Sequence, residues 1–168
     1  MPLSAKNYGL QVDECIDERF DIEKSTLAAC KHIKDAYKVF NNWTLSAAAY
    51  NLGIGGIQAA LKKQKSDDYF DLILNTETGS FLYRILAYKT LFSNPQHFGI
   101  NTKKLIYKTK LPVKTYFIDT TVNYLSSLEK AFGCDIATVK LFNPWFIGEK
   151  LPNTDSYTYQ FKIISINS

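Results

Sequence analysis

The residues with the clearest potential for chemistry lie in the run Ala48 to Ile57, which reads AAYNLGIGGI. Tyr50 offers a flat apolar face, and Asn51 offers both a hydrogen-bond donor and an acceptor. The three glycines do not indicate a phosphate-binding loop, because no strand is expected before them and no Lys-Ser or Lys-Thr pair follows. Taken alone, the run predicts two helices joined by a tight turn, with a packed tyrosine and an asparagine at the end of the first helix.

Metal-dependent chemistry is not indicated by the cysteines or the histidines. Cys15, Cys30 and Cys134 have no CxxC or CxxH spacing, and no HExxH motif occurs. The two histidines, His32 and His97, lie far apart in the sequence, and the pattern assigns neither of them a role. We therefore expect no metal ion and no cofactor.

The composition is that of a folded protein. The chain has 168 residues, of which 46% are hydrophobic and 21% are charged, so it can bury a core and is not mainly disordered. Residues 1–100 carry 11 basic and 11 acidic side chains, whereas residues 101–168 carry nine and five. The net charge of +4 therefore arises in the second part. No nucleic-acid-binding module accompanies this charge, so nucleic acid is not an expected partner.

Helices are expected in the first 100 residues. Apolar residues at intervals of three and four predict a helix that begins after Asp21, its N-cap, and ends near Phe40. An alanine-rich helix from about Thr44 should stop at Gly53. Further helices are expected from a turn at Gly53, Gly55 and Gly56 to about residue 63, over residues 67–74, and over residues 76–93, where Asn94-Pro95 ends the last one.

The pattern changes after Gly99. Residues 101–114 hold five lysines and no acidic residue, which is typical of a linker or an edge strand. Beyond them the sequence predicts a strand near 115–118, helices over 121–132 and 136–142, and a strand over 157–164. This order, βααβ, is that of a compact module of about 50 residues.

One uncharged stretch, residues 39–61, is long enough to suggest a membrane span. It also contains three asparagines, one glutamine and three glycines, so a buried pair of helices is the better interpretation. The N-terminus has no basic segment followed by an apolar run, and the sequence as given therefore carries no secretory signal.

Several runs, in the same order, resemble the goose-lysozyme-like lytic transglycosylases. Residues 49–57 resemble their AYNxGxGxV/I signature. Residues 17–26 are similar to the DERxDPEKAT segment of the membrane-bound murein transglycosylase D type, with Ile22 in place of proline. Residues 77–87 resemble ETRxYVxRxLA, with Phe81 where the family has tyrosine, and residues 93–99 resemble SNPxxYG. Residues 1–10 look like the end of GLWQFMPxTxxxYGL.

The resemblance implies which residues contact sugar. In the family, the Tyr and Asn of the signature line the glycan cleft, which assigns substrate binding to Tyr50 and Asn51. Glu77 and Met1 would be further substrate contacts. The family's acid/base glutamate belongs to a Glu-Ser motif upstream of the position that Met1 occupies, so we expect no catalytic residue in this sequence. Glu77 lies near a helix N-terminus, which stabilises the carboxylate and does not suit a proton donor; a capping role for it remains open.

The C-terminal module also has a resemblance. Residues 125–133 (LSSLEKAFG) and 139–145 (VKLFNPW) look like the helix pair of a LysM domain, whose signature ends in LxxLNP. Such modules bind chains of N-acetylglucosamine. A module of this kind can also serve only to pack on its neighbour, and Asn143-Pro144 is equally a helix stop.

The expected fold is mainly α: a lysozyme-like helical lobe over residues 1–100, a basic linker over 101–114, and a small βααβ LysM-like module over 115–168. The implied function is that of a peptidoglycan lytic transglycosylase, which cleaves the MurNAc-GlcNAc bond and forms 1,6-anhydromuramyl ends. The implied partner is the glycan strand, and the implied location is the bacterial cell envelope, in the periplasm or at the outer membrane. Two alternatives remain open, a non-catalytic peptidoglycan-binding protein and an incomplete gene product that folds poorly.

Overall fold

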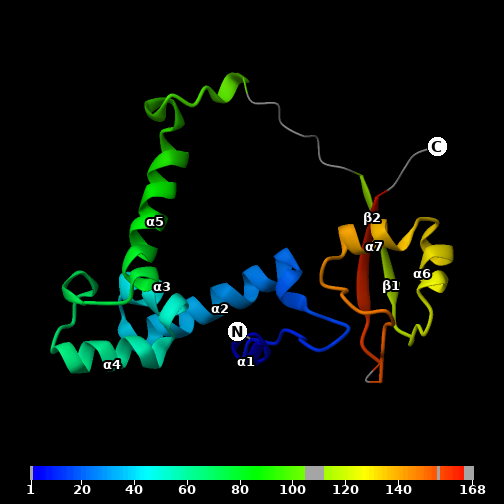
Figure 1. The fold of residues 1–168 in the computed structure, drawn as a ribbon, viewed down its shortest axis with the longest axis horizontal. Helices are drawn as coiled ribbons and strands as arrows, with labels where there is room; N and C mark the ends of the chain where they lie inside the picture. The colour runs from blue at the N-terminus through cyan, green and yellow to red at the C-terminus, as the bar shows by residue number, and fades with distance from the viewer. Residues whose placement is uncertain (1, 105–111, 155, 165–168) are drawn as a thin grey trace. The chain divides into compact units, whose positions relative to one another are not determined.

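The computed structural model describes residues 2–104, 112–154 and 156–164 (Figure 1). These residues are mostly helical and contain one small antiparallel sheet, which confirms the predicted fold class. The chain forms two compact units, Met1–Ala28 together with Thr109–Ser168, and Ala29–Lys108. The first unit therefore joins the start of the expected helical lobe to the C-terminal module.

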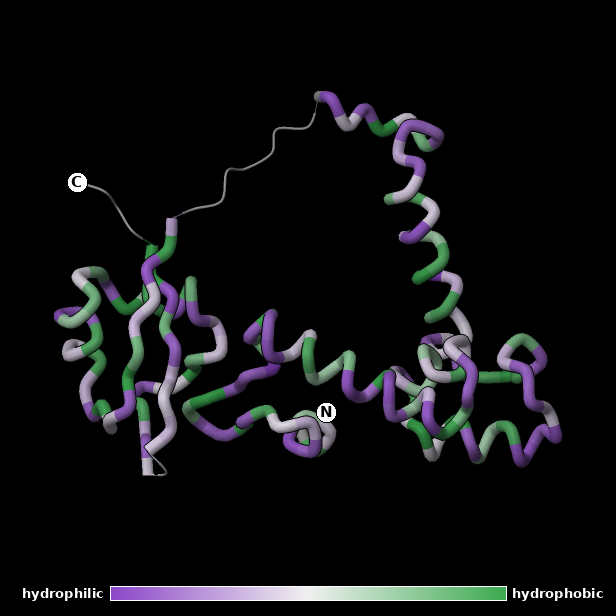
Figure 2. Tube along the Cα trace, turned by 180° about the vertical axis from the view of Figure 1, so that it is seen from behind, coloured by the Kyte–Doolittle hydropathy of each residue, from purple (hydrophilic) through white to green (hydrophobic). Residues whose placement is uncertain are grey.

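Helix α2 (Ile22–Phe40) begins where the sequence predicts. The Asp21 carboxylate accepts hydrogen bonds from the backbone N–H groups of Glu23 and Lys24, at 2.9 and 3.0 Å, and so caps the first turn. In the first unit α2 is preceded by helix α1 (Pro2–Asn7). Hydrophilic and hydrophobic residues alternate along α2, as expected for an amphipathic helix (Figure 2).

Helices α3 (Trp43–Leu52) and α4 (Ile54–Gln64) meet at a single residue, Gly53. Its φ of 85° lies in the region that favours glycine, so this residue ends α3. The prediction that Gly55 and Gly56 also form the turn is wrong, because both lie in the first turn of α4. A Cβ at Gly56 would come within 2.7 Å of the Leu52 side chain, so glycine there permits close packing.

The predicted helix over residues 67–74 is also wrong, because only the 3-10 turn Tyr69–Asp71 forms. The Asp68 carboxylate accepts from the Phe70 N–H at 2.9 Å and starts this turn. Beyond it, the Gln64 side chain accepts from the N–H of Ile73 at 2.8 Å and donates to its carbonyl at 3.0 Å. These two bonds satisfy the backbone of Ile73 in place of helical hydrogen bonds.

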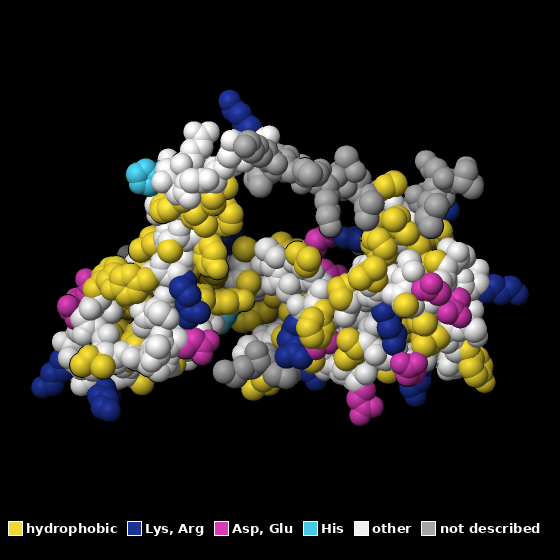
Figure 3. Space-filling view, turned by 45° about the horizontal axis from the view of Figure 1, so that its top comes forward, with side chains coloured by type: hydrophobic (Ala, Val, Ile, Leu, Met, Phe, Trp, Pro, Cys, Tyr) yellow, Lys and Arg dark blue, Asp and Glu magenta, His cyan; other side chains and the backbone are white. Residues whose placement is uncertain are grey.

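Helix α5 (Thr76–Ser93) ends at Asn94, as predicted. It packs on α3, whose two fully buried alanines, Ala48 and Ala49, allow close approach. The buried members of the core here are Ala36, Leu45, Ala48, Ala49, Ile57, Tyr69 and Leu82. Part of α5 is exposed, and Figure 3 shows hydrophobic side chains gathered on this helix, among them Ile85, Leu86, Tyr88 and Phe92.

The predicted βααβ order is confirmed in the C-terminal module. Strands β1 (Val113–Ile118) and β2 (Tyr159–Ile164) pair antiparallel, with Tyr116 opposite Phe161, and enclose α6 (Leu125–Phe132) and α7 (Ile136–Phe142) in the chain order. Helix α6 begins four residues later than predicted, because Val122 exchanges two backbone hydrogen bonds with Leu151 and is extended. Within the expected basic linker, residues 101–114, residues 105–111 lie outside the described residues, Thr102–Lys104 form a 3-10 turn, and Val113 and Lys114 begin β1.

No helix within the described residues is long and apolar enough to cross a membrane. The uncharged stretch over residues 39–61 runs from the end of α2 through α3 into α4, so it contains the helix pair that the pattern indicates.

Asn143 joins α7 to β2 and is almost fully buried. Its Nδ2 donates to the carbonyls of Val139 and Lys162, at 2.8 and 2.9 Å, and its Oδ1 accepts from the Lys162 N–H at 2.7 Å. We predict that Asn143→Ala lowers the free energy of unfolding by about 2–4 kcal/mol, because two backbone groups of Lys162 lose their partner. Urea denaturation measures this change. The exposed Asn123→Ala is the control, and an equal effect of both substitutions would contradict the prediction.

Candidate functional site

The Tyr50 ring lies on the last turn of α3, between side chains from two other helices. Its centroid is 5.6 Å from that of His32 on α2 and 6.4 Å from that of Phe81 on α5, and the Phe81 ring is nearly parallel to it. Tyr50 remains 44% exposed. The ring is therefore held in place by its neighbours while part of it stays accessible to a ligand.

The Asn51 side chain contacts α5 through both ends of its amide. Its Nδ2 donates to Oε1 of Glu77 at 3.0 Å, and its Oδ1 accepts from the Thr78 hydroxyl at 2.6 Å. A primary amide has two N–H donors and two acceptor positions. Asn51 can therefore keep these two bonds and still donate to, and accept from, a ligand.

The start of α5 fixes the partners of Asn51. The Asn75 side chain caps this helix by accepting from the Thr78 N–H at 2.8 Å. The Tyr69 hydroxyl lies 2.9 Å from the carbonyl oxygens of both Thr78 and Gly79 and donates toward them. Thr78 is fully buried, whereas Glu77 is exposed in the first turn. The carboxylate of Glu77 can therefore serve as an acceptor at the surface.

The structure brings together three of the four predicted substrate-binding residues, Tyr50, Asn51 and Glu77. Met1 lies outside the described residues. Sequence reasoning missed His32 and Thr78. His32 occupies the α2 face toward α3, which helical periodicity could have indicated, but the hydrogen bond of Thr78 depends on how α3 and α5 pack and has no signal in the sequence.

Titration at this site is governed by burial. Burial lowers the pKa of His32, and the nearby Asp35 carboxylate opposes that shift only in part. Burial also raises the pKa of Tyr69, so its hydroxyl keeps the proton that it donates. Among the described residues, no group of three His, Cys, Asp or Glu side chains is placed to hold a metal ion. The arrangement is therefore one of hydrogen-bonding groups beside an aromatic face.

Comparison with known proteins identifies both parts of the chain. Residues 1–73 match the family described as Transglycosylase SLT domain, and residues 114–165 match the family described as Soluble lytic transglycosylase C-terminal LysM-like domain. The chain thus combines an SLT segment with a LysM-like domain. Tyr50 and Asn51 lie within the SLT segment, and Glu77 and Thr78 follow it.

The chain also matches two curated relatives. Membrane-bound lytic murein transglycosylase D of Escherichia coli K12 is 33% identical over 105 residues, which cover 60% of this chain and 23% of the relative. The protein of the same name from Escherichia coli O6:H1, strain CFT073, matches with the same values. The chain therefore spans less than a quarter of the length of these relatives.

Replacement of Thr78 tests the bond that orients Asn51. We predict that Thr78→Val, which keeps the shape of the side chain, lowers the free energy of unfolding by about 1–3 kcal/mol, because Oδ1 of Asn51 loses a buried donor. Chemical denaturation followed by circular dichroism measures the loss. Thr76→Val, an exposed substitution on the same turn, serves as the control; a Thr78→Val protein as stable as this control would contradict the prediction.

The histidine beside Tyr50 makes a pH-dependent contribution to stability. Because its pKa is lowered in the folded state, the unfolded chain binds more protons, and the contribution of His32 is lost as the pH falls below about 6.5. We predict that Tyr50→Ala exposes the imidazole and moves its pKa back up. Titration of the His32 ring proton by NMR measures this shift. His97→Gln is the control, because it leaves His32 as the one histidine and so assigns its signal. An unchanged His32 titration in Tyr50→Ala would show that the Tyr50 ring does not bury this imidazole.

Proposed function

We propose that this chain is part of a peptidoglycan lytic transglycosylase. We propose further that its helical unit, the compact unit Ala29–Lys108, binds the glycan strand through Tyr50, Asn51 and Glu77. The observation that carries this proposal is the contact of Asn51 with Glu77 beside the half-exposed Tyr50 ring, next to the end of the SLT segment. The names of the E. coli relatives, lytic murein transglycosylases, support murein as the substrate.

The chemistry of these residues suits an amino sugar. An N-acetyl group has one N–H and one carbonyl, which match the acceptor and donor capacity that remains on Asn51. The apolar face of a sugar ring stacks on an aromatic side chain, and Tyr50 offers such a surface. Glu77 can accept a hydrogen bond from a sugar hydroxyl while it holds the Asn51 amide. Phe81, which stands where the family has tyrosine, supplies an apolar contact without a hydroxyl.

Bond cleavage needs a further group. A carboxylic acid must protonate the leaving GlcNAc oxygen of the MurNAc-GlcNAc bond. The C6 hydroxyl of the MurNAc then attacks C1 of the same MurNAc and gives its proton back to the carboxylate, which leaves the 1,6-anhydro ring. Glu77 is exposed in the first turn of α5, and its Oε1 already accepts a hydrogen bond from Asn51, so the structure gives it the role of an acceptor at the surface. We propose that the proton donor is not among these 168 residues, and that they bind the glycan without cleaving it.

The proposed location is the bacterial cell envelope, in the periplasm or at the outer membrane, where murein is found. The names of the two relatives describe them as membrane-bound, which supports this location.

A second candidate function is non-catalytic binding of N-acetylglucosamine chains by the LysM-like domain. It is favoured by the family match over residues 114–165 and by two exposed aromatic side chains, Phe117 and Tyr124. In this case the helical unit would contribute little to glycan affinity.

Co-sedimentation with purified sacculi tests the binding proposal. We expect the wild-type chain to sediment with sacculi, and we expect Tyr50→Ala and Asn51→Ala each to weaken binding by about tenfold or more, which corresponds to about 1.4 kcal/mol. Tyr83→Ala, on the exposed side of α5, is the matched control. Binding that survives in both site variants would favour the LysM-like domain as the binding site.

Mass spectrometry of the soluble products tests the proposed lack of cleavage. A full-length transglycosylase of the D type should release 1,6-anhydromuramyl products from the same sacculi, and the 168-residue chain should release none. Anhydro products that disappear in Tyr50→Ala would show that the proton donor lies within these residues and would overturn that part of the proposal.

A further inference from the structure

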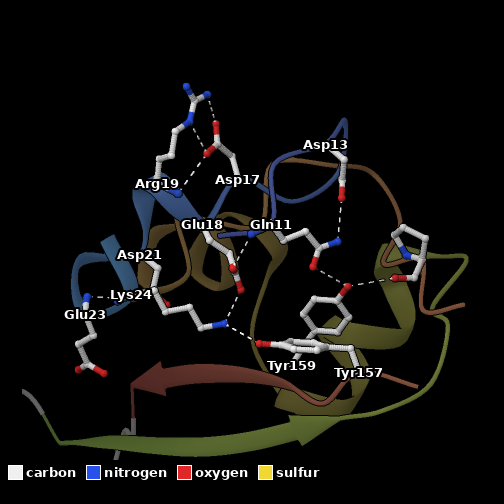
Figure 4. A network of polar contacts seen from close by, with 11 residues as sticks. Gln11, Asp13, Asp17, Glu18, Arg19, Asp21, Glu23, Lys24, Tyr157 and Tyr159 are labelled. Atoms are coloured by element: carbon white, nitrogen blue, oxygen red, sulfur yellow. Dashed lines mark hydrogen bonds and ion pairs between the residues drawn. The ribbon is translucent and has the colours of Figure 1, made fainter. Parts of the chain in front are cut away.

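Residues Gln11 to Lys24, the segment that precedes α2 and includes its first turn, pack on the LysM-like domain within the first compact unit (Figure 4). We propose that this contact is a permanent docking surface, and that the LysM-like domain folds only together with this part of the SLT segment. The two family matches would then not be two independent folding units. This inference does not depend on the proposed function.

The backbone carries the first part of the contact. The Asp17 N–H donates to the Trp145 carbonyl at 2.8 Å, and the N–H groups of Ile147 and Gly148 both donate to the Cys15 carbonyl at 3.0 Å. These bonds form an antiparallel bridge between Ile16 and Phe146. Backbone groups that are paired in this way would lose their partners if the segment moved away.

The fit at Gly148 is close. A Cβ placed on this residue would lie 2.7 Å from both Cα and Cβ of Cys15. Because Cα belongs to the backbone, a larger residue could not be accommodated by a side-chain rotation. Glycine at this position therefore permits the segment to approach. The contact depends on where the backbone of residues 15–17 runs, and a larger residue at position 148 would block it.

The segment also completes the hydrophobic core of the LysM-like domain. Ile16 is fully buried in the cluster that contains Trp145, Phe146 and Phe161. Without the segment, this side of the cluster would face water. A domain of about 50 residues buries little apolar surface, so the loss of a core residue weighs heavily on it.

A network of polar side chains also joins the segment to the LysM-like domain. Glu18 is nearly fully buried, and its carboxylate accepts from the Gln11 N–H at 2.7 Å and from the Lys24 ammonium. The Lys24 ammonium also lies 3.1 Å from the Tyr157 hydroxyl. The Tyr159 hydroxyl donates to Oε1 of the Gln11 side chain at 3.1 Å. Burial works against the charge on Lys24, but the hydrogen bonds to Glu18 and Tyr157 outweigh it and raise its pKa.

The docking has a consequence for ligands. The surface formed by residues 145–148 and by Tyr157 and Tyr159 already holds a segment of the same chain. A glycan could reach this surface only by displacing the segment. The LysM-like domain therefore acts here first as a support for the residues that lead into α2.

Hydrogen–deuterium exchange of the full chain tests the proposal. In Ile16→Ala we expect the amides of Asp17, Ile147 and Gly148 to exchange at least about tenfold faster, and we expect β2 to lose protection with them, while α3 keeps its own. Ile22→Ala is the matched control, because Ile22 is 79% exposed in the same segment. A β2 strand that keeps wild-type protection in Ile16→Ala would overturn the proposal.

A second variant keeps the test decisive if Ile16→Ala does not fold. Gly148→Ala leaves every core side chain in place and puts a methyl group where the segment must pass. We expect the same acceleration at Asp17 and in β2, with Glu149→Ala as a control at the neighbouring exposed residue. Wild-type exchange at Asp17 in Gly148→Ala would show that the segment is not docked as proposed.

Discussion

The hydrogen bond between the Thr78 hydroxyl and the Asn51 amide determines the geometry of the candidate site. It joins the last turn of α3 to the first turn of α5, at a point where Thr78 is fully buried. It is costly to leave this partly buried acceptor without its donor, so the bond fixes which end of the amide faces Thr78. The Nδ2 of Asn51 must then point toward Glu77, and the Tyr50 ring, one residue earlier, lies against His32 and Phe81.

The geometry at Asn51 and Glu77 suits hydrogen bonding to a ligand better than it suits proton transfer. The acceptors and donors of Asn51 and Glu77 are arranged at the surface of two helices, where a polar ligand can replace water. A general acid needs the opposite environment, one that disfavours its charge. Glu77 is instead exposed to solvent, and its Oε1 accepts a hydrogen bond from the Asn51 amide. The same contacts that suit Glu77 for binding therefore make it a poor proton donor.

The sequence predicted local features better than contacts between elements. The Asp21 cap, the end of α3 at Gly53 and the end of α5 at Asn94 depend on residues within one turn, and each was predictable. The turn at Tyr69–Asp71 was mistaken for a helix because the hydrogen bonds from Gln64 to Ile73 cross nine residues. Tyr50 and Asn51 were proposed from a family resemblance, and helical periodicity could have indicated His32, whereas Thr78 became visible only through packing.

The limits of a family match and the limits of a packed unit need not coincide. Family models follow sequence similarity, so they place residues 1–73 in one family and residues 114–165 in another. Burial instead places Ile16 in the core of the second part, where it contacts aromatic residues that a short domain needs to keep dry. A chain that brings an isoleucine from more than 100 residues away can complete such a core without a larger domain. The SLT segment and the LysM-like domain then share one hydrophobic core through Ile16. A substitution in that core on either side would change the stability of the residues that lead into α2.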